Sequence, residues 1–253
     1  MPTRLLEDRV ALVTGAGRNI GRAIALALAG EGAKVAVNVN TGRDAGQRLV
    51  EEIGSRGGEA MLVPADVTQR PGVDAMIDAV AKRFARLDIV INNAAIRNEV
   101  AFADLSYDVW RAAYAVCVDG AFHCTQAALP LLRQSDAAAI INIGGMTAHT
   151  GAAKRAHVVT AKAAIVGLTR ALAHELAEFG ITVNCVAPGL VDTLRDGVSA
   201  SATPAHHATH TTLLGRRGRP DEIADVVAWL AGPRARYITG QTVHVNGGAY
   251  LGG

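Results

Sequence analysis

Short apolar runs alternate with longer amphipathic stretches along the chain. The apolar runs are four to seven residues long, rich in valine and isoleucine, and typical of buried parallel strands. They cover residues 10–13, 34–40, 59–63, 87–92, 140–143 and 180–186, with a last run inside 237–248. Helical periodicity follows at 23–33, 44–56, 71–85, 106–133, from about 154 to 180, and from 220 onwards. This alternation predicts the α/β class, with one Rossmann-type doubly wound parallel sheet, helices on both faces, and a single domain over residues 1–253.

A glycine-rich turn, residues 14–21, connects the first strand to the first helix. Glycines let the backbone approach a pyrophosphate, and the amides at the start of a helix present partial positive charge to it. Tight strand-to-helix turns also use glycine for geometry alone, but this position favours a dinucleotide site. The residues predicted to contact the cofactor here are Gly15, Arg18, Asn19, Ile20 and Gly21.

The end of the second strand bears on the choice between NAD and NADP. In dinucleotide-binding folds an acidic residue at this position receives the ribose hydroxyls of NAD. Here Asn40 ends the strand, and no acid stands between it and Arg43. Arg18 and Arg43 can both reach a 2′-phosphate, or they simply face solvent. We expect NADP(H) rather than NAD(H), with Asn40 and Arg43 beside the adenosine end of the cofactor.

Composition and charge narrow the classes of function. Half of the 253 residues are apolar, which suits one large core, and acids and bases are interspersed around a net charge of +2. We therefore expect no nucleic-acid partner, and no apolar run reaches the roughly 18–20 residues of a membrane span. The first residues lack the layout of a signal peptide. Three cysteines do not make a disulfide framework, so we expect a cytoplasmic protein without a membrane partner.

Several motifs together resemble the short-chain dehydrogenase/reductase family over essentially the whole chain, and its 3-oxoacyl-carrier-protein-reductase-like members in particular. They are the glycine turn, the run Asn92-Asn93-Ala94-Ala95 (Ala95 replaces a family glycine), the Pro188-Gly189 turn and Lys162. The resemblance implies an NAD(P)-dependent oxidoreductase acting on a carbonyl or alcohol of a small molecule. It also implies a substrate lid at about 190–215 and a last strand that packs across a homotetramer interface.

The resemblance implies further cofactor contacts along the chain. These are Asp66, Val67, Asn93, Ala94, Ala95, Ile143, Lys162, Pro188, Gly189, Val191 and Thr193. In the family the Asp-Val pair contacts the adenine, and the Pro-Gly loop with its Thr holds the nicotinamide carboxamide.

The chain departs from the family at the catalytic positions. Aligning on Lys162 places the family's Tyr at Val158 and its Ser at Gly145, and the Asn of the preceding helix falls at Cys117. Only Lys162 is kept. The family's Tyr supplies the proton for the developing alkoxide and its Ser bonds the substrate oxygen, and valine and glycine do neither.

Two histidines are candidate substitutes for the missing proton donor. His149 lies in the loop after the strand, and His157 precedes the Tyr position but needs a distorted helix start to point into the cleft. Either one, and Cys117 as a nucleophile, is more often an ordinary surface or core residue. His206, His207 and His210 form a cluster without a carboxylate or cysteine nearby, so we predict no metal site.

Three hypotheses stay open. The first is an oxidoreductase with an altered proton donor. The second is a catalytically silent nucleotide-binding subunit that partners an active homologue. The third is a lyase or dehydratase that uses His149 or His157. We favour the first because the cofactor framework is nearly complete.

Overall fold

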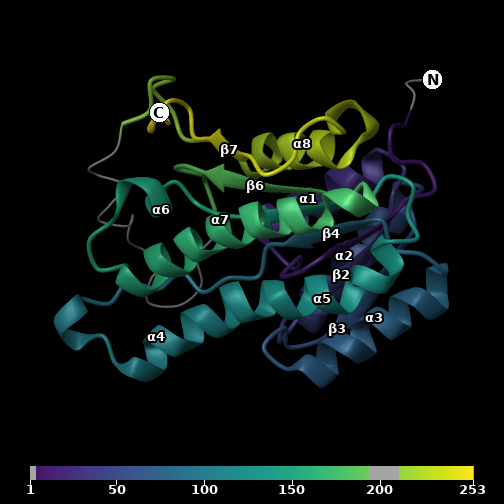
Figure 1. Cartoon of the computed structure of the whole chain (residues 1–253), viewed down its shortest axis with the longest axis horizontal. Helices are drawn as coiled ribbons and strands as arrows, with labels where there is room; N and C mark the ends of the chain where they lie inside the picture. Colours follow the sequence, from purple (N-terminus) through teal and green to yellow (C-terminus); the bar gives the residue numbers. More distant parts are fainter. Residues whose placement is uncertain (1–3, 194–210, 253) are drawn as a thin grey trace.

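The computed structural model describes residues 4–193 and 211–252 and shows one parallel sheet between two layers of helices (Figure 1). The sheet order is β3-β2-β1-β4-β5-β6-β7, and every neighbouring pair is parallel. The strands are β1 Val10–Val13, β2 Lys34–Val39, β3 Ala60–Pro64, β4 Ile89–Asn92, β5 Ala139–Ile143, β6 Thr182–Pro188 and β7 Thr242–Val245. Strand order reverses between β1 and β4, and ligands of such sheets bind beyond the carboxyl ends of the strands at this reversal. The predicted fold class is confirmed.

The helices connect successive strands, as parallel pairing requires. They are α1 Asn19–Gly30, α2 Arg43–Ser55, α3 Arg70–Phe84, α4 Tyr107–Tyr114, α5 Gly120–Leu132, α6 Thr147–Thr150, α7 Ala156–Leu176 and α8 Pro220–Ala231. The prediction of a single domain over the whole chain stays a prediction.

Two helix predictions are wrong in detail. The helix expected over 106–133 is interrupted by a wide π-helical turn, Ala115–Asp119, which contains no proline or glycine to signal it. The helix expected from about 154 begins at Ala156, because Lys154 adopts a left-handed backbone with φ of 60° and Arg155 is non-helical with φ of −135°. The first departure contains Cys117, and the second lies just before His157, so each is at or beside a candidate active-site position.

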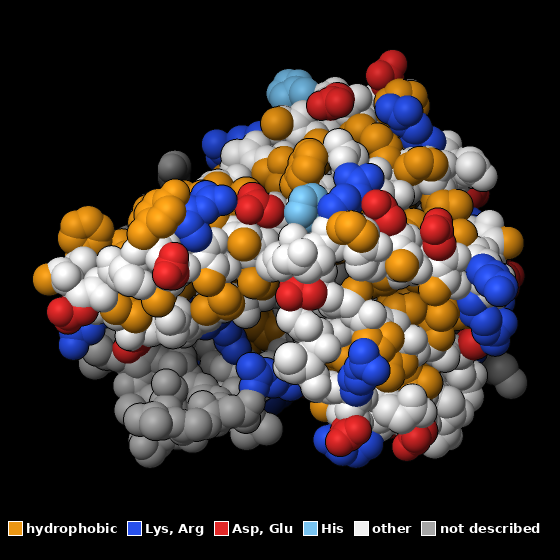
Figure 2. All heavy atoms as spheres, turned by 90° about the horizontal axis from the view of Figure 1, so that it is seen from below, with side chains coloured by type: hydrophobic (Ala, Val, Ile, Leu, Met, Phe, Trp, Pro, Cys, Tyr) orange, Lys and Arg blue, Asp and Glu red, His pale blue; other side chains and the backbone are white. Residues whose placement is uncertain are grey.

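The distribution of surface charge and the two long helices relate to the expectation of no nucleic-acid and no membrane partner. The face seen in Figure 2 carries Lys and Arg side chains interspersed with Asp and Glu, without a continuous basic stripe. Two helical stretches, Tyr107–Leu132 and Ala156–Phe179, are long and apolar enough by length and composition to cross a membrane. The apolar residues of core helices pass the same test, and α5 packs on β4 while α7 packs on β5 and β6.

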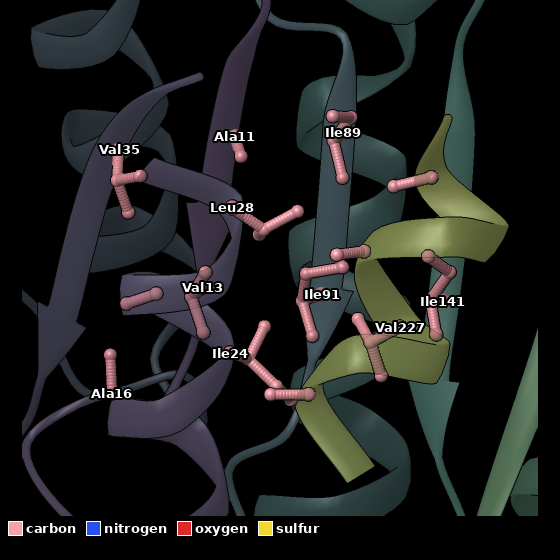
Figure 3. Close-up of a cluster of buried hydrophobic side chains, with 14 of the residues drawn as sticks. Ala11, Val13, Ala16, Ile24, Leu28, Val35, Ile89, Ile91, Ile141 and Val227 are labelled. Atoms are coloured by element: carbon pink, nitrogen blue, oxygen red, sulfur yellow. The ribbon is translucent and has the colours of Figure 1, made fainter. Parts of the chain in front are cut away.

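The core is divided by the sheet into two apolar layers. On one face Ile24 and Leu28 of α1 and Val227 of α8 meet Val13 and Ile91 of the sheet (Figure 3). On the other face α3, α5 and α7 cover the alternate residues of the same strands. Because both faces are covered, the strands consist almost entirely of apolar residues. A polar residue inside a strand is therefore a sign of a specific hydrogen-bonding role.

Candidate active site

Hydrogen bonds from the residues that follow β4 fix the glycine turn after β1. The Asn93 side chain donates to the carbonyls of Thr14 (2.9 Å) and Gly15 (3.1 Å). In return Thr14 Oγ1 accepts from the backbone N–H groups of Asn93 (2.9 Å) and Ala94 (3.1 Å). Gly15 has φ of +62°, and a Cβ at Gly21 would lie 2.4 Å from the Gly15 carbonyl, so neither position accepts a side chain. Asn93 therefore shapes the phosphate turn.

The start of α1 suits an anionic ligand. Its N-cap residue makes no side-chain cap hydrogen bond, and a helix start without such a cap presents its amide groups to a phosphate. Asn19 has φ of 50°, a backbone strain that is common at binding sites. Ile20 is buried and anchors the turn to the core. These residues fit the pyrophosphate of a dinucleotide.

The adenosine end contains a residue that sequence reasoning missed. Asn38, buried inside β2, donates to the carbonyls of Val63 (3.0 Å) and Ala65 (3.1 Å). Its Oδ1 accepts from Gly15 N–H at 3.4 Å, so one side chain ties β2, β3 and the glycine turn together. A polar residue in an otherwise apolar strand was the available signal.

The predicted adenosine contacts surround this point. Asn40 and Arg43 are exposed beyond the end of β2, and Arg18 is exposed in the glycine turn just before α1. Asp66 accepts from Thr68 N–H at 2.9 Å and so fixes the turn after β3. Val67 is buried. Beyond β2, where an NAD-binding fold would place an acid, the chain therefore has the neutral Asn40 and the positively charged Arg43.

Lys162 lies at the centre of the catalytic positions. Its Nζ donates to the Ile143 carbonyl at 2.5 Å, and the residue is 6% exposed. A Cβ on Gly145 would lie 4.0 Å from Lys162 Cγ, so the Ser position faces the lysine. Val158 stands one helical turn before Lys162 on α7 and is 2% exposed. The structure thus brings together the positions that the alignment assigned to Ser, Tyr and Lys.

Two cysteines lie near this group. Cys117 is buried inside the π-helical turn, which packs against α7. Cys185, which the sequence analysis did not single out, is buried on β6 beside Gly144. Burial raises the pKa of the Cys185 thiol to about 11, and the nearby charge of Lys162 offsets only part of this. Cys185 is therefore a protonated core residue at neutral pH.

The turn after β6 is fixed from both sides. Pro188 accepts from Met146 N–H at 2.9 Å, and Gly189 donates to the Val245 carbonyl at 3.0 Å. A Cβ on Gly189 would lie 2.5 Å from Asn246 Cβ, which explains the glycine. Val191 is buried and pairs with Gly218. This turn therefore reaches the carboxyl end of β5, where the predicted nicotinamide contacts lie.

A cavity of about 820 Å³ opens between α1 and α8. Asn19 at the start of α1 and Thr193 after β6 both line it, together with Arg22, Arg217 and Asp192. Its lining does not include Lys162, so it adjoins the phosphate end of the predicted cofactor site rather than the catalytic positions. Of the expected lid, residues 194–210 lie outside the described residues, as do His206, His207 and His210.

The two candidate histidines have different surroundings. His149 on α6 packs edge-on against His244 of β7, with ring centroids 4.6 Å apart, and stacks on Tyr250 of the tail at 5.6 Å. His157, at the start of α7, is 0% exposed, and its Nε2 lies 2.8 Å from Asn98 Oδ1. The structure places His149 toward the edge strand and His157 toward the segment that follows β4. Among the described residues no group of three His, Cys, Asp or Glu side chains could hold a metal.

Known proteins are similar to this chain over nearly its whole length. A family model described as enoyl-(acyl carrier protein) reductase matches residues 15–250. The 3-oxoacyl-[acyl-carrier-protein] reductase FabG of Staphylococcus aureus is 40% identical over 242 residues, which are 95% of this chain and 98% of the relative. The Vibrio cholerae FabG is 38% identical over 247 residues, 97% of this chain and 99% of the relative.

Solved structures give the same picture. A short-chain dehydrogenase from Burkholderia cenocepacia in complex with NADP is 34% identical, with a TM-score of 0.88 over 97% of this chain and 99% of its own. The angucycline C-6 ketoreductase LanV with bound NADP is 32% identical, with a TM-score of 0.90 over 98% of each chain.

Proposed function

The chain belongs to the short-chain dehydrogenase/reductase family of NAD(P)-dependent oxidoreductases, and from this membership we propose a specific activity. The protein is an NADP(H)-dependent enzyme that interconverts a carbonyl and an alcohol group of a small molecule. Its proton donor is not the family's tyrosine. Two observations carry the proposal. The glycine turn held by Asn93 supports cofactor binding, and Gly145 and Val158 beside Lys162 support the replacement of the family's Ser and Tyr.

Three features support NADP(H) as the cofactor. The glycine turn and the start of α1 fit a pyrophosphate, and no acid follows β2 before Arg43. Two similar solved structures contain NADP. When bound, the cofactor supplies or accepts the hydride, and the chain's own residues bind it, orient it and handle the proton. Lys162, with Nζ held at the Ile143 carbonyl, lies beside the vacant Ser position at Gly145.

The proton donor must differ from that of the family. Gly145 has no side chain to bond a substrate oxygen, and Val158 has no proton to give. Loss of a positioned general acid costs about 10²–10⁴ in rate, and loss of one oxyanion donor costs a comparable factor. The enzyme is therefore slow, or another group supplies the proton.

A second candidate function rests on the same two residues. Gly145 and Val158 also suit a catalytically silent subunit that binds the nucleotide and assembles with an active homologue. Such a subunit binds NADPH without oxidising it.

The first experiment is a fluorescence titration with NADPH and, separately, NADH. We expect NADPH to bind much more tightly, and Arg43→Ala to weaken NADPH binding about tenfold, the effect of losing one charge-assisted hydrogen bond. NADH binding should be nearly unchanged, and Arg48→Ala on the same helix serves as the matched control. Failure of both nucleotides to bind contradicts the proposal.

The second experiment is a screen of carbonyl substrates, beginning with 3-oxoacyl thioesters because the similar curated enzymes are named for them. Substrate-dependent oxidation of NADPH supports the oxidoreductase. Tight binding without turnover supports the silent subunit, and product formation without net oxidation supports a lyase or dehydratase.

We also propose a homotetramer in the cytoplasm, or a hetero-oligomer if the chain is silent. Large apolar side chains are exposed along α4 and α5, among them Tyr107 and Phe122, and β7 is an edge strand. Exposed apolar surface of this kind marks protein contacts. The three cysteines are buried and unpaired, which suits a reducing compartment. Light scattering on the purified protein measures the oligomeric state, and a monomer contradicts this assignment.

A further inference from the structure

We propose that His157 exchanges the proton with the substrate oxygen and that Asn98 holds its ring in the required orientation. This inference rests on the proposed oxidoreductase function and names the group that replaces the missing tyrosine. Asn98 is a positioning residue, because it acts through the histidine.

The imidazole of His157 has one nitrogen fixed and the other unsatisfied. Its Nε2 lies 2.8 Å from Asn98 Oδ1. An amide oxygen only accepts, so Nε2 carries the proton of the neutral ring and Nδ1 keeps its lone pair. Nδ1 is buried and has no hydrogen-bond partner among the described residues. One nitrogen held by an orienting side chain, with the other left for the reacting proton, is the arrangement of a general acid–base histidine.

A buried and unsatisfied nitrogen is costly unless it has a role. Leaving a buried acceptor without a partner costs about 1–3 kcal/mol. Such groups are rare in folded proteins, and catalytic roles are one of the recognised explanations. A substrate hydroxyl that donates to Nδ1 would satisfy it.

The backbone ahead of α7 turns His157 inward. Lys154 has φ of 60° and Arg155 has φ of −135°, so the helix begins only at Ala156. The Lys154 carbonyl accepts from Val100 N–H at 2.8 Å, which fastens this irregular turn to the segment after β4. His157 is thus enclosed between two segments of the chain rather than on the outer face of the helix.

Both enclosing segments border the predicted cofactor site. The segment after β4 begins at Asn93, which holds the glycine turn. The other segment continues into Val158, at the vacant tyrosine position, and then Lys162. His157 therefore lies next to the vacancy, on elements that also position the cofactor and the lysine.

His149 is less suited to this role. Its ring is packed against His244 and Tyr250, residues of the edge strand and the tail. Its Nε2 is also buried without a hydrogen-bond partner among the described residues, but no side chain holds the other nitrogen as Asn98 holds that of His157.

The proton and the electrons balance in either direction. In reduction, the carbonyl carbon receives a hydride with two electrons from the reduced nicotinamide, and the carbonyl oxygen receives a proton from Nδ1 of the charged imidazole. The neutral ring then regains a proton from water. In oxidation, neutral Nδ1 takes the hydroxyl proton as the hydride leaves the carbon.

The surroundings of His157 set the expected pH dependence. Burial lowers the pKa of His157, the charge of Arg155 lowers it further, and a hydrogen bond with the backbone of Asn98 partly opposes them. The other charged residues of the two enclosing segments are Arg97, Glu99 and Asp104 after β4, and Lys154 and Lys162 on the other. A neutral imidazole near pH 7 favours alcohol oxidation, and reduction should accelerate as the pH falls toward the pKa of the ring.

The test compares His157→Gln and Asn98→Ala with His174→Gln, which changes an exposed histidine on the same helix. We expect His157→Gln to lower kcat by about 10²–10³ with little change in NADPH affinity. Asn98→Ala should lower kcat by about tenfold and move the pH profile, and His174→Gln should match wild type. NADPH binding and Tm verify that each variant is folded.

A readout without turnover separates catalysis from packing. Nitrogen NMR of the histidine rings in the cofactor-free protein should show the Nε2–H tautomer for His157, and Asn98→Ala should change both its tautomer balance and its pKa. If wild type oxidises NADPH with a carbonyl substrate while His157→Gln keeps its kcat and pH profile, the inference fails and the oxidoreductase stands. If Asn98→Ala lowers Tm but leaves the ring pKa and the profile unmoved, its positioning role fails. No substrate-dependent oxidation by wild type overturns both proposals.

Discussion

The Lys162 ammonium group donates a hydrogen bond to the carbonyl of Ile143, with Nζ and O 2.5 Å apart. This bond joins α7 to the carboxyl end of β5. The side chain is almost entirely buried. A buried ammonium is costly unless it is hydrogen-bonded, and this carbonyl is the partner that the described structure supplies. The bond keeps the charge at the edge of the sheet where the turns after β1, β5 and β6 converge.

Replacing Lys162 with methionine should weaken cofactor binding without unfolding the protein. Methionine keeps most of the side-chain length and removes the charge and its hydrogen bonds. A hydrogen bond to a charged group is worth about 1.5–3 kcal/mol, so we expect NADPH affinity to fall about 10- to 100-fold. Fluorescence titration measures it, and Lys154→Met, at an exposed position, is the control. Equal affinities for the two variants would show that Lys162 has only a packing role.

The fold could be predicted from the sequence because local patterns specify it, and the cofactor contacts, which rest on motifs of the same kind, stay a prediction. Apolar runs mark the buried strands, and the glycine turn stands between a strand and a helix. The role of Asn38 was missed because its partners are distant in sequence: Val63 lies in β3 and Ala65 lies just after that strand. Hydrogen bonds between distant segments leave no periodic trace in the sequence.

The two candidate histidines show the same limit more sharply. Sequence reasoning left His149 and His157 open because both lie near the vacant positions. The structure separates them through Asn98, which is 59 residues from His157 along the chain and carries no recognisable motif. The left-handed Lys154 that makes their contact possible is also unforeseeable, because lysine seldom adopts a positive φ.

Replacing each of two adjacent glycines after β5 with serine should affect the stability of the protein to different extents. A Cβ at Gly145 would lie 4.0 Å from its nearest neighbouring atom, Lys162 Cγ, whereas a Cβ at Gly144 would lie 2.7 Å from Cys185 Sγ. We expect Gly145→Ser to change the free energy of unfolding by less than about 0.5 kcal/mol, and Gly144→Ser to cost about 1–3 kcal/mol through overpacking. Urea denaturation measures both. Similar costs at the two positions would mean that the pocket at Gly145 is closed in solution.

The buried carboxylate of Asp88 should be essential for stability. It is 0% exposed and accepts from Val10 N–H at 2.9 Å, Ser135 Oγ at 2.5 Å, and the Arg86 guanidinium at 2.7 and 2.8 Å. Burial alone would raise the pKa of Asp88, but the bonds from Arg86, Ser135 and Val10 outweigh it, and the pKa is lowered.

Asp88→Ala leaves these donors without an acceptor, and we expect it to cost about 3 kcal/mol of unfolding free energy. Arg9 pairs with both Asp88 and Asp136, but the Asp136 side chain is 77% exposed, so Asp136→Ala is the matched control and should change little. Denaturation curves at neutral pH compare the two. A small effect at Asp88 would show that water replaces its contacts after local rearrangement.

Stability should fall in mild acid because of the ring cluster His149, His244 and Tyr250. Burial lowers the pKa of His149, with a further contribution from Arg170, and burial together with the neighbouring His149 lowers the pKa of His244. The unfolded chain, with histidine pKa near 6.5, therefore binds protons before the folded one does. The stabilisation is complete above about pH 6.5 and is lost as the pH falls through the lower folded-state pKa values.

The variant His244→Phe tests this directly, because phenylalanine keeps a ring against His149 and Tyr250 and cannot be protonated. We expect the decrease in Tm between pH 7 and pH 5 to be smaller in His244→Phe than in wild type. The exposed His174→Gln should leave the wild-type slope unchanged, since that residue has no ring partner among the described residues. His157 has a lowered pKa as well, so part of the acid sensitivity should persist in His244→Phe. An identical slope in all three proteins would mean that the ring cluster opens before it is protonated.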